Sequence, residues 1–130
     1  MANDLNSVDN LPPLENKPNS HIDEWVKAAD FTVRDDFTQK KYQNINWLYS
    51  EYLDLKVKNL QTWQNGVEPQ KVKYFINNKN KIKNISVVNY YGDNIIVDGN
   101  HRATAARILG WNTIRAEYIN YEDSKIDNIE

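Results

Sequence analysis

Four side chains that could do chemistry stand within five consecutive positions. They are Asp98, Asn100, His101 and Arg102, and Gly99 separates the first from the rest. Asp98 and His101 can take up or release a proton, and Arg102 can hold a phosphate through two parallel hydrogen bonds. Gly99 has no Cβ and lets the backbone approach an anion closely. This spacing indicates a phosphate site with an acid–base group beside it.

The neighbouring residues place this group at the start of a helix. Ile95–Val97 is a short β-branched run typical of a buried strand, and positions 98–100 have turn chemistry. A helical pattern runs from His101 to Leu109, and Gly110 is placed to end it. A helix N-terminus carries free N–H groups and the positive end of the macrodipole, so it favours an anion.

The same stretch predicts how the helix packs. One stripe of the predicted helix contains Arg102, Ala105, Ala106 and Leu109, and the small alanine side chains allow the helix to pack closely on a sheet. The alternating apolar residues of 114–118 then predict a second strand.

Each polar residue also has a plainer interpretation. Asn100 can simply cap the helix, and Arg102 can form a structural ion pair with Asp98 or cap a carbonyl group. Asp98 can cap the helix, orient His101, deprotonate a hydroxyl, or hold Mg²⁺ through a bound phosphate. His101 is expected to be neutral, because the dipole disfavours a cation there, and it can simply be packed. Thr104 is a peripheral hydroxyl contact.

The motif Asp98-Gly99-Asn100-His101-Arg102 resembles the signature of the ParB N-terminal/sulfiredoxin-like superfamily, in its DGHHR or DGNHR branch. The likeness continues through the paired alanines, Leu109-Gly110, Ile114 and Ala116. It implies an α/β (α+β) fold, in which helices pack on a small mixed β-sheet. It also implies that a nucleotide or phosphate binds at the helix N-terminus, at Gly99, Asn100, His101, Arg102 and Thr104.

Members of this superfamily use that site for phosphoryl transfer, nucleotide-gated DNA clamping or nuclease activity. In many of them a residue of the N-terminal half completes the phosphate site, which makes Arg34 a candidate, followed by Asp35 and Asp36. Asn100 stands where true sulfiredoxins have their cysteine. Because the chain has no cysteine at all, the resemblance does not extend to sulfiredoxin activity.

The rest of the chain predicts a single domain over residues 21–130, preceded by a disordered arm over residues 1–20 that is rich in proline and polar residues. The arm could instead dock through Leu11 and Leu14. Residues 120–130 are expected to fray or to end in a short helix. The remaining elements expected are helices over 21–29, 44–64 and 69–76, a strand over 85–91, and a hairpin turn at 92–94. Aromatic residues of the 44–64 segment pack in the core or line a groove in which a base could stack.

Composition limits the function further. The chain has 130 residues and a net charge of −2, which makes the case for DNA binding weak. No apolar run is long enough to cross a membrane, and no export signal is visible, so we expect a cytoplasmic protein. Abundant Asn, Lys and Ile point to an AT-rich bacterial or phage genome.

Three functions remain open. The first is a domain that binds a nucleotide or phosphate at the motif, with or without turnover. The second is a Mg²⁺-dependent enzyme for phosphoryl transfer, nucleotide hydrolysis or nucleic-acid cleavage, with Asp98 or His101 as the base. A single carboxylate makes no metal site, so Mg²⁺ would arrive with the nucleotide. The third is a module for binding a protein partner, such as a phage or plasmid regulator with a relic pocket.

Overall fold

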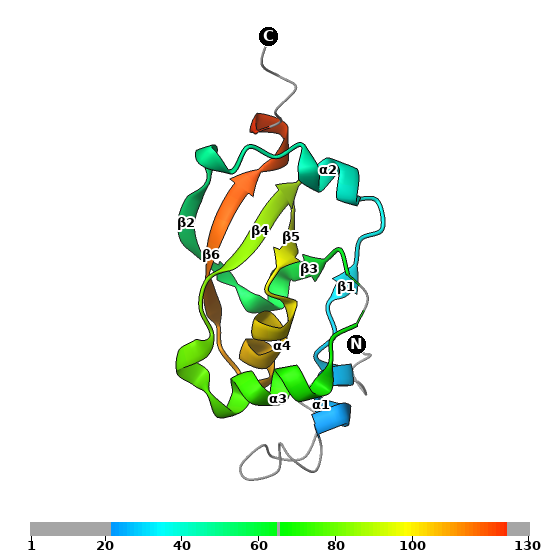
Figure 1. Cartoon of the computed structure of the whole chain (residues 1–130), viewed down its shortest axis with the longest axis vertical. Helices are drawn as coiled ribbons and strands as arrows, with labels where there is room; N and C mark the ends of the chain where they lie inside the picture. Colours follow the sequence, from blue (N-terminus) through cyan, green and yellow to red (C-terminus); the bar gives the residue numbers. More distant parts are fainter. Residues whose placement is uncertain (1–21, 65, 125–130) are drawn as a thin grey trace.

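A computed structural model describes residues 22–64 and 66–124. They form one six-stranded mixed sheet in the order β1-β3-β5-β4-β6-β2 (Figure 1). The strands are β1 (Thr32–Val33), β2 (Glu51–Lys56), β3 (Leu60–Thr62), β4 (Ile85–Tyr90), β5 (Asp93–Asp98) and β6 (Thr113–Asn120). The helices are α1 (Ile22–Ala28), α2 (Gln39–Gln43), α3 (Pro69–Asn77) and α4 (Asn100–Ile108). The predicted α/β fold with a mixed sheet is confirmed.

β5 lies near the centre of the sheet and ends at the motif. It pairs parallel with β3 and antiparallel with β4, and Ile95, Ile96 and Val97 are all buried. Because alternate side chains of a strand point to opposite faces, Ile96 joins the core under α4, while Ile95 and Val97 join the core on the other face. The end of β5 is therefore fixed from both sides.

α4 packs on the sheet with one side and on helices with another. Ala103 and Ala106 contact the sheet core, while Ala105 and Ile108 join the core formed with α1 and α3. The predicted stripe is thus rotated: Ala106 faces the sheet as expected, but Ala105 faces the helices. α4 begins at Asn100, one residue before the predicted start, and Gly110 follows its end at a φ of 81°.

The prediction of a helix over 44–64 is wrong. This segment contains β2, β3 and the short 3-10 helices Trp47–Tyr49 and Val57–Asn59. All six residues of β2 pair with β6, and Leu53, Leu55 and Val57 face the core while polar residues alternate with them. The apolar residues also fit a helical spacing, but the pairing of β2 with β6, in which alternate side chains face the core, determines the structure.

The aromatic residues of that segment divide between core and surface. Trp47 and Trp63 pack against the core around Phe37, and Trp63 Nε1 donates to the Val97 carbonyl at 3.1 Å. Tyr49 and Tyr52 are exposed. Packing thus accounts for two of these side chains, and the other two remain available at the surface.

Other predicted elements agree with the structure apart from their ends. α1 buries Trp25 and Val26, as expected. The hairpin turn lies at Tyr91 and Gly92, both with positive φ, and not at 92–94, because a two-residue turn of this kind matches the twist of its strands. A 3-10 helix spans Tyr121–Asp123, where the sequence indicated fraying or a short helix. The predicted arm over 1–20 and the tail 125–130 lie outside the described residues. No described helix is long and apolar enough to cross a membrane.

Candidate functional site

Gly99 joins β5 to α4 and is the N-terminal cap residue of the helix. It adopts a φ of 99°, and no side chain caps the helix there. The predicted capping by Asn100 is therefore wrong, since Asn100 is already the first helical residue. A Cβ on Gly99 would lie 2.6 Å from Ile85 Cγ2 and 2.8 Å from Arg102 Nη2. Only glycine fits between the sheet and this guanidinium, and the first-turn N–H groups are left without a side-chain cap.

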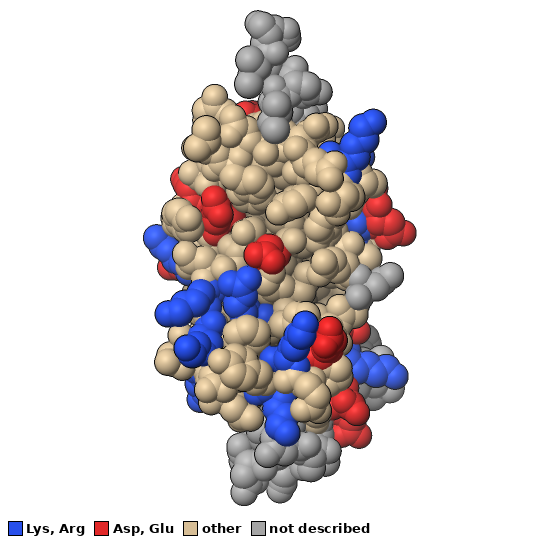
Figure 2. Space-filling view, in the orientation of Figure 1, with Lys and Arg blue, Asp and Glu red and all other residues tan. Residues whose placement is uncertain are grey.

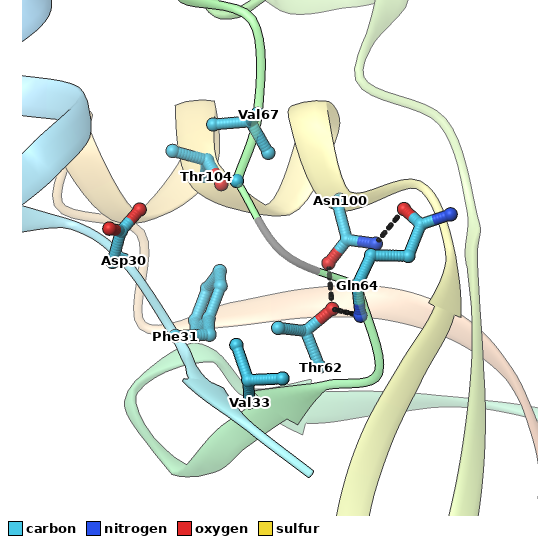
Figure 3. Close-up of a pocket in the computed structure, with 9 residues that line it drawn as sticks. Asp30, Phe31, Val33, Thr62, Gln64, Val67, Asn100 and Thr104 are labelled. Carbon is cyan, nitrogen blue, oxygen red and sulfur yellow. Dashed lines mark hydrogen bonds between the residues drawn. The ribbon is translucent and has the colours of Figure 1, made fainter. Parts of the chain in front are cut away.

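Asn100 connects the start of α4 to the end of β3. Its side chain is buried, with 5% of the residue exposed. Its Oδ1 accepts a hydrogen bond from Thr62 Oγ1 at 2.5 Å, and its Nδ2 donates to Gln64 Oε1 at 2.9 Å (Figure 3). Thr62 Oγ1 also accepts from the Gln64 backbone N–H at 3.2 Å. This network fixes the chain that leaves β3 against the helix N-terminus.

A small cavity of about 90 Å³ lies beside this network. Thr104, which is buried, lies on its α4 side, and Asp30 lies across the cavity from Asn100 (Figure 3). Asp30 is at the exposed rim, where partial burial raises the pKa of its carboxyl although Arg107 and Lys27 oppose the change. A cavity of this size admits water or a very small polar ligand, and a whole nucleotide is too large for it.

A wider, open depression lies on the His101 side of the same chain segment. It has a volume of about 580 Å³ and is lined by Gln64, Gly66, Val67, Glu68 and His101. The depression is open to solvent and borders the start of α4 on the His101 side.

The surroundings of His101 favour its neutral form. Its Nε2 accepts a hydrogen bond from the Glu68 backbone N–H at 3.1 Å. Partial burial lowers the pKa of His101, Lys71 and Arg102 lower it further, and Glu68 partly offsets them. A neutral imidazole that accepts at Nε2 carries its proton on Nδ1. His101 is therefore a hydrogen-bond donor through Nδ1, with its basic nitrogen already engaged.

Arg102 is engaged by the protein in two places. Its Nη1 donates to the Asn84 carbonyl at 2.6 Å, and its Nη2 lies 3.5 Å from Asp98 Oδ2. These are the carbonyl contact and the ion pair of the plainer interpretation. The ion pair is long, and 70% of the Asp98 side chain is exposed. Since a guanidinium has five N–H donors, Arg102 keeps donors for a further ligand.

Arg34 is not brought to the motif. Its guanidinium pairs with both carboxylate oxygens of Asp36 at 3.0 Å and with Asp93 at 2.6 Å, and this lowers the pKa of Asp36. Asp93 begins β5 and Asp98 ends it, so about 16 Å separates them at 3.3 Å per residue. Asp35 lies with Arg34, away from the motif, in a shallow hollow.

Sequence reasoning missed four residues that surround the motif. Thr62 and Gln64 bind Asn100, Glu68 binds His101, and Lys71 forms an ion pair with Glu68 at 3.4 Å. The first two lay in the segment predicted as a helix, so no local pattern could direct them to α4. Within the described ranges, no cluster of three His, Asp or Glu side chains could hold a metal ion.

Comparison with known proteins gives limited similarity. No protein-family model and no curated protein matches the chain. Among solved structures, the crystal structure of sulfiredoxin from Arabidopsis thaliana is similar, with 22% identity, a TM-score of 0.47, and coverage of 56% of this chain and 91% of that chain. The chain has no cysteine and is therefore not a cysteine-dependent sulfiredoxin. Similarity at this level says nothing of what the chain binds.

Proposed function

We propose that this chain is a ParB/sulfiredoxin-like domain that binds a nucleotide or another phosphate-bearing ligand at the N-terminus of α4. The observation that carries the proposal is the cap at Gly99. This residue leaves the first-turn N–H groups without a side-chain cap, and the Arg102 guanidinium lies next to it. A phosphate there would accept from the N–H groups and meet the positive end of the macrodipole.

Three side chains around this end are donors or cations, and they stand beside the carboxylates of Asp98 and Glu68. Arg102 has unused N–H groups, His101 presents Nδ1–H, and Lys71 is close enough to lower the pKa of His101. The neighbouring depression of about 580 Å³ can take the rest of a nucleotide. Mg²⁺ would enter with the phosphates, and Asp98 is the one carboxylate in the motif that could contact it.

Binding is supported better than turnover because the basic nitrogen of His101 already accepts from Glu68. The second candidate function is Mg²⁺-dependent phosphoryl transfer or hydrolysis. The exposed carboxylate of Asp98 favours it, since this group could accept a proton from a nucleophile near the helix end.

The proposal is tested by thermal shift with a panel of nucleoside mono-, di- and triphosphates, with and without Mg²⁺, followed by calorimetry on any ligand that raises the melting temperature. Arg102→Ala should weaken binding by roughly tenfold or more, since a hydrogen bond to a charged group contributes about 1.5–3 kcal/mol.

Arg115→Ala is the matched control. Arg115 is an exposed arginine of β6 that pairs with Asp54. Its neighbours Ile114 and Ala116 join the core under α4, so the Arg115 side chain lies on the opposite face of the sheet, and its removal should leave affinity unchanged. The absence of any stabilising nucleotide, or an equal loss of affinity in both variants, would contradict the proposal.

A further inference from the structure

The segment between Glu68 and Asp93 is strongly basic. Residues 69–92 contain no Asp, Glu, Arg or His, and they hold five lysines: Lys71, Lys73, Lys79, Lys81 and Lys83. This segment carries a charge of +5 in a chain of net charge −2, so the rest of the chain carries −7. The weak case for DNA binding rested on the net charge of the whole chain. That net charge does not reveal how unevenly the charges are distributed along the sequence.

The lysines at the end of this segment stand on an ordered support. A 3-10 helix spans Lys79–Lys81, and Ile82 donates its N–H to the Lys79 carbonyl at 3.0 Å. Ile82 packs against the two cores next to α4, while Lys79, Lys81 and Lys83 are exposed. Figure 2 shows lysine and arginine side chains gathered over the connection from α3 to β4, with no acidic side chain among them.

This basic surface is continuous with α3 and with the motif. Asn84 follows Lys83, and its carbonyl accepts from Arg102 Nη1 at 2.6 Å. On α3, Lys71 and Tyr74 are one turn apart on the same exposed side, and Tyr74 is 49% exposed. Lys71, which pairs with Glu68 at 3.4 Å, thus shares one side of α3 with the ring of Tyr74, and Asn84 connects the lysines between α3 and β4 to Arg102.

We propose that this lysine surface, made of Lys71, Lys73, Lys79, Lys81 and Lys83 with Tyr74, binds single-stranded nucleic acid. The lysines of this segment would bind the phosphate backbone, and the exposed ring of Tyr74 in the same segment offers a face on which a base stacks. An acidic protein or an anionic membrane could use the same charge and ring, so the test below includes a salt slope and a vesicle arm. The surface adjoins the proposed nucleotide site, because Lys71 lies near both, but Lys79, Lys81 and Lys83 lie outside that site and the proposal does not depend on it.

The test is fluorescence anisotropy with a labelled, mixed-sequence 20-nucleotide DNA strand, titrated with the full chain at several salt concentrations. If five lysines contact phosphates, the plot of log K against log[salt] should have a slope of about −3.5, from about −0.7 per contact on single strands. Lys81→Gln/Lys83→Gln should weaken binding at least about fivefold and reduce the slope to about −2. Tyr74→Leu should weaken binding by roughly fivefold or more with the slope unchanged.

The matched control is Lys27→Gln/Lys40→Gln, which removes the same charge from exposed positions on α1 and α2. It should change affinity less than twofold. An equal loss in the two double variants would overturn the proposal, as would no binding of wild-type protein at low salt. Binding to phosphatidylserine vesicles without binding to the oligonucleotide would overturn it as well. Nucleotide affinity, measured separately, should be unchanged in Lys81→Gln/Lys83→Gln, so that the two proposals can fail independently.

Discussion

Replacing Asn100 by alanine should reveal how strongly the network at the start of α4 holds the site together. The substitution removes two side-chain hydrogen bonds, to Thr62 and to Gln64. At about 1 kcal/mol each, with about 1 kcal/mol more for the buried Thr62 hydroxyl left without its acceptor, the loss is about 3 kcal/mol. The adjacent cavity of about 90 Å³ can admit water to the vacated position, which would reduce the loss to about 1.5 kcal/mol.

The measurement is urea unfolding followed by tryptophan fluorescence, with an unchanged slope against denaturant to show that the unfolded state is the same. A double-mutant cycle with Thr62→Val should give a coupling of about 1–2 kcal/mol, because the two side chains share one hydrogen bond. Asn84→Ala is the control: Asn84 is exposed, and its contact with Arg102 runs through the backbone carbonyl. An Asn100→Ala variant within 0.5 kcal/mol of wild type, with no coupling to Thr62, would refute the reasoning.

Three further predictions concern the motif and its flanks. Gly99→Ala should destabilise the fold by about 2 kcal/mol or more, because Gly99 has a φ of 99° and the new Cβ would lie 2.6 Å from Ile85 Cγ2. Gly110→Ala is the comparison in the same urea assay: Gly110 also has a positive φ, but a Cβ there would meet no neighbour, so the cost should be about 1 kcal/mol. The folded-state pKa of His101 lies below its ordinary value of 6.5, so the unfolded chain binds the proton more readily. The contribution of His101 to stability should therefore be fully present above pH 6.5 and be lost as the pH falls below it. His101→Gln should flatten this fall when melting temperature is measured against pH. If the domain is an enzyme, Asp98→Asn should lower phosphate release about 10²-fold while nucleotide affinity survives; unchanged turnover in that variant would exclude Asp98 as the base.

The strand, turn and helix around the motif could be predicted from the sequence because their signals are local. The run Ile95–Val97, the glycine at position 99 and the alanines of α4 each favour one conformation over a few residues, and the neighbouring elements agree with them. The prediction that His101 and Arg102 lie in the first turn of the helix follows from these local signals. The identity of the cap residue was wrong, since Gly99 and Asn100 can both serve as a cap and the tight packing against Ile85 decides between them. The side of α4 that faces the sheet was predicted only in part, because Ala105 packs on α1 and α3.

The partners of these residues could not be predicted, because they depend on distant pairing. Thr62 and Gln64 lie 38 and 36 positions before Asn100 and reach it only through the parallel pairing of β3 with β5. That pairing required β3 to be a strand, whereas Leu60 continues the helical spacing of the apolar residues before it when the sequence is read alone. Arg34 was assigned to the site by resemblance, whereas two carboxylates, of Asp36 and Asp93, hold it near the opposite end of β5.

Arg102 shows why the structural and the ligand-binding interpretations of a motif residue need not exclude each other. Its contact with the Asn84 carbonyl is short, at 2.6 Å, and fixes the guanidinium against the start of β4. Its contact with Asp98 is long, at 3.5 Å, and mostly exposed to solvent, where an ion pair contributes little. A phosphate at the end of α4 could therefore replace Asp98 as the partner of Nη2 without disturbing the bond to Asn84. Asp98 would then be released next to the bound phosphate, in the position where a carboxylate could contact a phosphate-bound Mg²⁺.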